Sequence, residues 1–169
     1  MKDQPGALGQ ILGGWQVGVI LSVQSGLPFG VVNGGRFPAG DYNADAQEGD
    51  RPDTPSFGNT FSDTPSTSEF INGVFQTSDF PSPAAGSSGN LGKNTFTGPA
   101  FRTVDLSLLK NFRLPMSEAT LLQFRAEFFN LFNRVNLYLP NINLNGSTFG
   151  KSNQAFDARE IQFALKLLF

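Results

Sequence analysis

Side chains that carry oxygen atoms crowd one short segment, and their spacing is that of a cation-binding loop. Asp41, Asn43 and Asp45 occupy alternate positions in DYNADAQEGDRPD, and oxygen ligands at the first, third and fifth positions begin calcium loops. Two later positions depart from the pattern, because Ala46 stands where an EF-hand has Gly and Pro52 where it has Glu. We favour a solvated acidic loop, with a weak calcium site at Asp41, Asn43 and Asp45 as the alternative.

A second set of charged residues falls in segments whose polarity alternates. A catalytic interpretation would make Asp105 and Glu127 a paired acid and base. Ionisable residues at membrane depth normally face a protein interior or a water-filled cavity. We therefore favour a network that lines a lumen, formed by Asp105, Arg125, Glu127 and Lys166. In that network we expect Asp105 to lie across from Arg125 on a neighbouring strand.

The composition excludes several other chemistries. With no Cys and no His, the chain has no disulfide, no thiol nucleophile, no His-based triad and no Cys/His zinc site. A net charge of −2 without a Lys/Arg cluster gives no case for binding nucleic acid. Because no nucleophile and base can be paired from the sequence, we predict that the chain is not an enzyme and needs no cofactor.

Strands are the elements that would position these side chains, and alternation of apolar and polar residues predicts four of them, near 15–25, 102–112, 120–129 and 160–169. The last is the clearest, because every second residue from Ile161 to Phe169 is apolar. A helix is the alternative over 118–133, where good helix formers occur. The strict alternation from Leu122 to Phe128 favours a strand there.

Between the strands, residues 26–101 and 130–159 are rich in turn-forming residues and lack periodicity, whereas the link 113–119 is short. Such long irregular loops are uncommon in a compact soluble domain but are normal on the external side of outer-membrane barrels, where they need no core. No apolar run is long enough for a transmembrane helix. The predicted fold is therefore all-β, an antiparallel meander of about four transmembrane β-strands with long irregular loops.

Aromatic residues agree with a membrane-spanning sheet. Trp15, Phe112 and Phe169 would stand at the same end of their strands, all on the apolar face. Rings at one height form a girdle at a membrane interface. Lys110 shares that face by parity, and we expect its long side chain to reach the polar boundary.

These segments together resemble parts of TonB-dependent outer-membrane receptors of the Oar-like type. The resemblance follows the family's order through GWQV, QSGLPF, DLSLLKNF, FRAEFFNLFN and REIQFALKLLF, at residues 14–17, 24–29, 105–112, 124–133 and 159–169. It implies the C-terminal segment of a large barrel of about 22 strands in the outer membrane of a Gram-negative bacterium. It also gives Phe169 a second role, as part of the sorting signal read by the barrel-assembly machinery.

In that family a plug inside the barrel contacts TonB and drives uptake of a large nutrient. We expect the chain to supply membrane wall and ligand-facing loops, with outer-membrane lipid, a preceding barrel portion and the plug as partners and with TonB reached only through that plug. The start of the sequence does not read as a signal peptide, so we expect an export signal upstream. A soluble β-sandwich module for ligand binding or adhesion is the alternative.

Overall fold

The computed structural model describes residues 9, 12–36, 40–56, 64–114 and 120–169. The chain forms two compact units. We call Met1–Val23, Arg102–Arg134 and Asp157–Phe169 the strand unit, and Gln24–Phe101 with Val135–Phe156 the loop unit. Each is described separately below.

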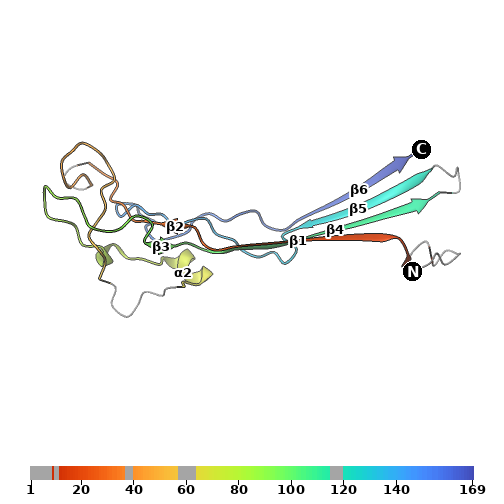
Figure 1. Cartoon of the computed structure of the whole chain (residues 1–169), viewed down its shortest axis with the longest axis horizontal. Helices are drawn as coiled ribbons and strands as arrows, with labels where there is room; N and C mark the ends of the chain where they lie inside the picture. Colours follow the sequence, from red (N-terminus) through yellow and green to blue (C-terminus); the bar gives the residue numbers. More distant parts are fainter. Residues whose placement is uncertain (1–8, 10–11, 37–39, 57–63, 115–119) are drawn as a thin grey trace. The chain divides into compact units, whose positions relative to one another are not determined.

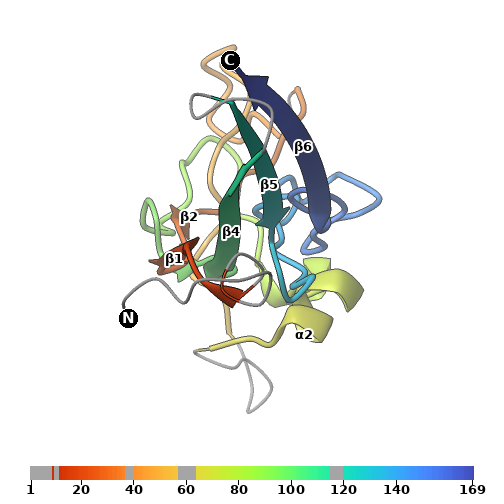
Figure 2. The same cartoon turned by 90° about the vertical axis from the view of Figure 1, so that its right-hand side faces the viewer.

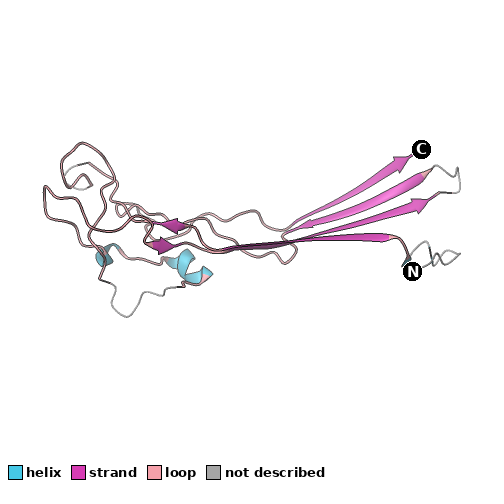
Figure 3. Ribbon diagram, in the orientation of Figure 1, coloured by secondary structure: helices cyan, strands magenta, loops and turns pink. Residues whose placement is uncertain are grey.

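A four-stranded sheet makes up most of the strand unit (Figures 1 and 3). Its strands follow one another across the sheet in chain order, as β1 (Trp15–Gln24), β4 (Phe101–Arg113), β5 (Leu121–Phe129) and β6 (Glu160–Leu168). The pairs β4–β5 and β5–β6 are antiparallel, and Figure 2 shows β5 between its two neighbours. The predicted all-β fold with an antiparallel meander is confirmed.

The register of the sheet places most of the large apolar side chains on one face and most of the polar side chains on the other. Phe112 pairs with Leu122, which pairs with Leu167 on its other side. Because side chains alternate along a strand, this register gathers the even positions of β4 and β5 with the odd positions of β6 on one face. A side chain at Gly18 of β1 would meet Ser107 on the other face, so the odd positions of β1 join the apolar face.

The observed strand bounds differ from the predicted ranges by one residue at most. The helical alternative for 118–133 is wrong where the structure describes that segment, because Leu121–Phe129 is strand β5. Residues 115–119, in the predicted short link, lie outside the described residues. The described part of the chain has no helix with the length and apolar character to cross a membrane.

The loop unit has regular elements and a core of its own. Two short strands, β2 (Pro28–Phe29) and β3 (Phe96–Thr97), pair antiparallel, and α2 (Thr67–Asn72) and the 3-10 helix η1 (Thr77–Asp79) lie between them in sequence. Phe75 lies among the other rings of the core, with its ring centroid 4.6 Å from that of Phe96. The buried core consists of Phe29, Val31, Phe75, Phe80, Leu91, Phe96, Leu144 and Phe149.

The prediction that the long loops need no core is therefore wrong. The core residues come from both predicted loops, 26–101 and 130–159. They occur singly among Gly, Pro and Asn, so they carry neither a helical nor a strand period. Burying an aromatic ring removes a large apolar surface from water, which explains how irregular backbone can still form a compact unit.

The start of α2 contains a titratable contact, and its protonation should loosen the helix. The backbone N–H of Ser66 donates to Oε2 of Glu69 at 2.7 Å, and the Ser66 hydroxyl donates to the same oxygen at 2.6 Å. These hydrogen bonds, the hydroxyl first, hold the pKa of Glu69 below its ordinary value.

Because the pKa of Glu69 is lowered in the folded protein, its carboxylate stabilises α2 fully at pH values above the pKa that Glu69 has in the unfolded chain. We expect this contribution to fade as the pH falls through the lowered value of Glu69. Amide hydrogen exchange of residues 67–72 between pH 3 and pH 7 measures it, as protection factors relative to an unstructured chain at the same pH. Glu69→Gln is the control that should remove the pH dependence of these protection factors. Equal dependence in both proteins would contradict the assignment.

Candidate functional site

The apolar face of the sheet is the first candidate surface. Its side chains are large and exposed on both outer strands, with Leu21 67%, Phe163 68% and Leu165 69% exposed. Ring contacts join neighbouring strands across this face, because Phe124 stacks on Phe163 at 6.3 Å between centroids. A row of exposed apolar side chains this extensive is the feature of a surface that contacts a partner or a membrane. The exposed members are Trp15, Val17, Val19, Leu21, Val23, Ile161, Phe163, Leu165, Leu167 and Phe169.

Aromatic residues gather at one end of this face. Trp15 begins β1, and its ring lies 6.3 Å from that of Phe124 in an edge-to-face arrangement. Phe112 is close to the end of β4. Phe169 directly follows β6 and is 97% exposed. Trp15, Phe112 and Phe169 thus share a face and an end of the sheet, while their role at a membrane interface stays a prediction.

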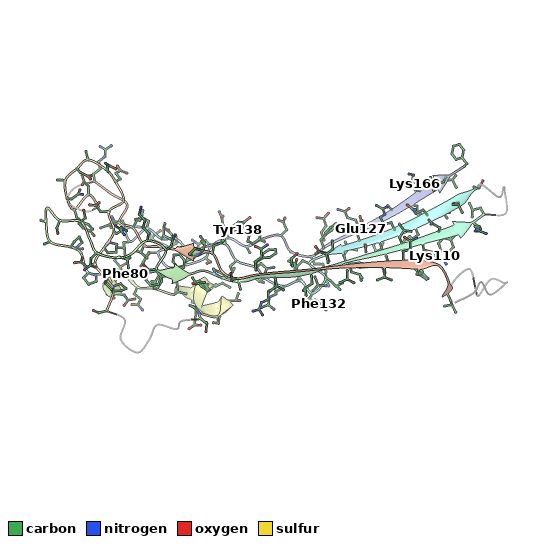
Figure 4. All side chains as sticks on the ribbon, in the orientation of Figure 1. Phe80, Lys110, Glu127, Phe132, Tyr138 and Lys166 are labelled. Atoms are coloured by element: carbon green, nitrogen blue, oxygen red, sulfur yellow. The ribbon has the colours of Figure 1, made fainter. Side chains whose placement is uncertain are left out.

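Lys110 lies near the same end of the sheet (Figure 4). Its side chain is sheltered there, whereas the sequence suggested that it would extend to the polar boundary. Its residue is only 2% exposed. The Nζ donates to the carbonyl oxygen of Gly13 and lies 5.8 Å from the Trp15 ring centroid and 5.4 Å from that of Phe112. The face of an aromatic ring attracts a cation, so the two rings and the carbonyl stabilise a charge on an otherwise apolar face.

The polar face carries the predicted lumen network, but not with the predicted pairing. Asp105 and Arg125 share this face by parity, yet the residue opposite Arg125 is Leu109. Asp105 lies four residues before Leu109 on β4, too far from the position opposite Arg125 for the predicted pairing. Asp105 instead accepts a hydrogen bond from the backbone N–H of Asn130 at 2.8 Å. The expectation that Asp105 lies across from Arg125 is wrong.

The remaining charges of the network lie along β5 and β6. Arg125 forms an ion pair with Glu127 on its own strand, at 3.9 Å between Nη1 and Oε1. Glu127 lies beside Gln162 of β6, and Lys166 lies beside Gln123. This face carries hydrogen-bonding and charged groups that suit contact with water, together with the apolar side chains of Ile20, Leu109 and Phe129. Its role in lining a lumen stays a prediction.

Asn130 organises the turn that follows β5, a role the sequence did not reveal. It is 6% exposed and adopts a φ of 49°, a left-handed conformation that Asn tolerates well. Its side chain accepts from the backbone N–H of Arg134 at 2.9 Å and donates to the carbonyls of Arg134 at 2.9 Å and Asp157 at 3.3 Å. It therefore joins the turn to the segment that enters β6.

Replacing Asn130 with Ala should lower the free energy of unfolding by about 2 kcal/mol, because buried polar groups lose their partners. Asn130→Gly keeps the left-handed backbone accessible and so separates conformational strain from lost hydrogen bonds. Urea unfolding of the protein in lipid vesicles measures both variants. If Asn130→Gly is as stable as the wild type, the side-chain hydrogen bonds contribute nothing.

The candidate calcium loop turns its oxygens toward its own backbone. The carboxylate of Asp41 accepts from the N–H groups of Asp45 at 3.1 Å and Ala46 at 3.0 Å. Asn43 Oδ1 accepts from the N–H of Asp45, and Asp45 Oδ1 from that of Gln47. In the described part of the chain, no group of three or more acidic side chains is placed to hold a metal ion. Calcium binding stays a prediction without support from this geometry.

The loop unit also contains a cavity that the sequence did not predict. It has a volume of about 380 Å³ and is lined mainly by apolar groups. The rings of Tyr138 and Phe156 stack at 4.1 Å on one side of it, and Phe101 meets Phe156 at 5.0 Å. Residues this far apart in sequence leave no local pattern. A cavity of this size and lining is suited to an uncharged ligand.

Comparisons with known proteins agree with the two-faced sheet. The family model described as outer membrane beta barrel domain matches residues 1–162. Neither the curated proteins nor the solved structures contain a match to the chain.

Proposed function

The chain belongs to the outer membrane beta barrel domain family, and from this premise we propose that it forms part of the wall of a TonB-dependent uptake receptor. Members of such a family reside in the outer membrane of Gram-negative bacteria, which is where this chain is located. Within the barrel it acts as membrane wall and as ligand-facing loops rather than as a catalyst.

The observation that carries the proposal is the difference between the two faces of the sheet. Exposed apolar side chains cover one face of β1 and β6, while Gln123, Arg125 and Glu127 mark the other. Barrel strands alternate in this way between lipid and lumen. A soluble β-sandwich would bury its apolar face against a second sheet, whereas Phe163 and Leu165 remain more than half exposed.

The edges of the sheet indicate what the chain needs from its surroundings. Among the described strands, β1 and β6 stand at the two edges. An open edge inside lipid would leave backbone groups unpaired, which a membrane does not tolerate. We therefore assign further barrel strands as partners of both edges, with outer-membrane lipid against the apolar face.

The TonB-dependent part of the proposal is supported by the motifs of residues 14–17, 24–29, 105–112, 124–133 and 159–169. A receptor of this class uses a plug within the barrel to reach TonB, and this chain would contact TonB only through that plug. The large apolar core of the loop unit suits loops that hold a fixed shape at a ligand entrance. The same resemblance implies a large nutrient and a barrel of about 22 strands, a size at which barrels enclose a plugged lumen.

Growth of a strain that lacks the gene tests the uptake function. The strain is compared with the wild type on limiting oligosaccharides, peptides and metal chelates, each as the sole source. We expect a defect on one class of nutrient, and the same defect, without further loss, when TonB is removed as well. Normal growth without the gene on every class that requires TonB would overturn the proposal.

Deletion of Phe169 should reduce the amount of protein in the outer membrane by about tenfold if this residue belongs to the assembly signal. The effect arises in biogenesis, because Phe169 is 97% exposed and deleting it removes little packing. Quantitative immunoblots of isolated outer membranes measure it. Phe132→Ala is the control, since Phe132 is also strongly exposed, at 74%, but lies far from the C-terminus in sequence. Equal amounts of wild type and deletion variant would contradict an assembly role.

A further inference from the structure

We infer that the strand unit binds the phosphate head group of an outer-leaflet lipid in a groove beside Arg102 and Arg134. The inference rests on the proposed placement of the apolar face in the membrane. The groove has a volume of about 410 Å³ and lies at the end of the sheet opposite to Trp15. Its apolar walls include Leu21, Val23 and Phe132.

Parity places most of the strand residues that line this groove on the apolar face, with Thr103 of β4 as the exception. Leu21 and Val23 are odd positions of β1, and Arg102 and Val104 are even positions of β4, so all four belong to the apolar face. Leu21 and Val23 are more than half exposed and Phe132 is 74% exposed. The long predicted loop 26–101 follows β1 at this end, and long loops are external in outer-membrane barrels, so the groove lies at the height of the outer-leaflet head groups.

The charge of the groove selects an anion. Its described lining includes two arginines, Arg102 and Arg134, and no acidic residue. The nearby Asp105 already accepts a hydrogen bond from the N–H of Asn130. Arg102 takes part in another interaction within the chain, but a guanidinium has five N–H donors. Its planar fork suits the two oxygens of a phosphate.

Hydrogen bonds fix the position of the Arg134 backbone. The side chain of Asn130 binds both the N–H and the carbonyl of Arg134. Asn130 in turn donates its backbone N–H to Asp105 of β4, and the N–H of Leu131 donates to the carbonyl of Val104 at 2.8 Å. The backbone of residues 130–134 is thus held against β4, the strand that carries Arg102.

An amphiphile satisfies both parts of the groove at once. A phosphate would neutralise the two guanidinium groups while an acyl chain covers Leu21, Val23 and Phe132, which are otherwise exposed. A free phosphate would use only the charged part. The geometry therefore favours a phosphate-bearing lipid.

Native mass spectrometry of the protein purified from its own outer membrane tests the inference. The measurement compares the binding of diphosphoryl lipid A, its dephosphorylated form and inorganic phosphate. We expect the diphosphoryl lipid to bind at least tenfold more tightly than the dephosphorylated lipid. Millimolar inorganic phosphate should not displace it.

A double variant and a single control variant complete the test. The double variant Arg102→Gln, Arg134→Gln should lose this preference, whereas Arg113→Gln, an exposed Arg at the other end of β4, should keep it. Equal binding of the two lipids, an unchanged preference in the double variant or displacement by inorganic phosphate would overturn the inference. Normal outer-membrane levels of the variants show that folding and membrane placement hold, so a failed lipid test leaves the receptor proposal standing.

Discussion

Replacing Lys110 with Glu should lower the free energy of unfolding by about 3–5 kcal/mol, the range for a buried charge left without a partner. The ammonium of Lys110 lies over the rings of Trp15 and Phe112 and donates to the carbonyl of Gly13. A carboxylate at this place would face the negative faces of two rings and a carbonyl oxygen. Every contact that stabilises the cation would oppose the anion.

Lys166 provides the matched control for this substitution. It is a Lys near the end of its strand, as Lys110 is, but it lies on the polar face beside Gln123. Lys166→Glu should change the free energy of unfolding by less than about 0.5 kcal/mol. Urea unfolding in lipid vesicles, followed by the fluorescence to which Trp15 contributes, measures both. Equal losses in the two variants would show that Lys110 has no special environment.

Replacing Phe163 with Arg should lower the free energy of unfolding by about 2–4 kcal/mol, the value for a charge facing lipid near the bilayer midplane. Phe163 lies in the middle of β6 and contacts the rings of Phe124 and Phe128. Its side chain is 68% exposed in the chain by itself, so in water an Arg there would cause little loss. The size of the effect therefore depends on lipid.

The neighbouring position supplies the comparison. Gln162 lies on the polar face beside Glu127, so Gln162→Arg places a cation near a carboxylate and should change stability by less than about 0.5 kcal/mol. Phe163→Leu keeps the face apolar and separates the loss of a ring from the gain of a charge. The same urea unfolding in vesicles measures all three variants. A loss for Gln162→Arg as large as that for Phe163→Arg would reverse the assignment of the faces.

The strands were predictable because their signal is local. In β6 the alternation from Ile161 to Leu167 needs no knowledge of the rest of the chain, and the same holds for Leu122 to Phe128 of β5. Alternation also identified the two faces, because parity follows from strand geometry. The register did not follow from parity, so the pairing of Asp105 with Arg125 was wrong although both residues were placed on the correct face.

Features that depend on contacts distant in sequence could not be predicted. The shelter of Lys110 requires a carbonyl from Gly13, which is close only because β1 and β4 are neighbours. The core of the loop unit joins Phe29, Phe75 and Phe149 from segments far apart in sequence. No sequence pattern distinguishes Asn130, and its importance lies in partners that the fold brings to it.

The central claim is that the odd-numbered face of β6 contacts lipid, and fluorescence quenching by brominated lipid tests it most directly. The sequence has no Cys, so single Cys variants of residues 161–167 can each carry one bimane label. We predict strong quenching at Ile161, Phe163, Leu165 and Leu167 and weak quenching at Gln162, Ala164 and Lys166. Uniformly weak quenching along β6, as a soluble β-sandwich would give, would contradict the account.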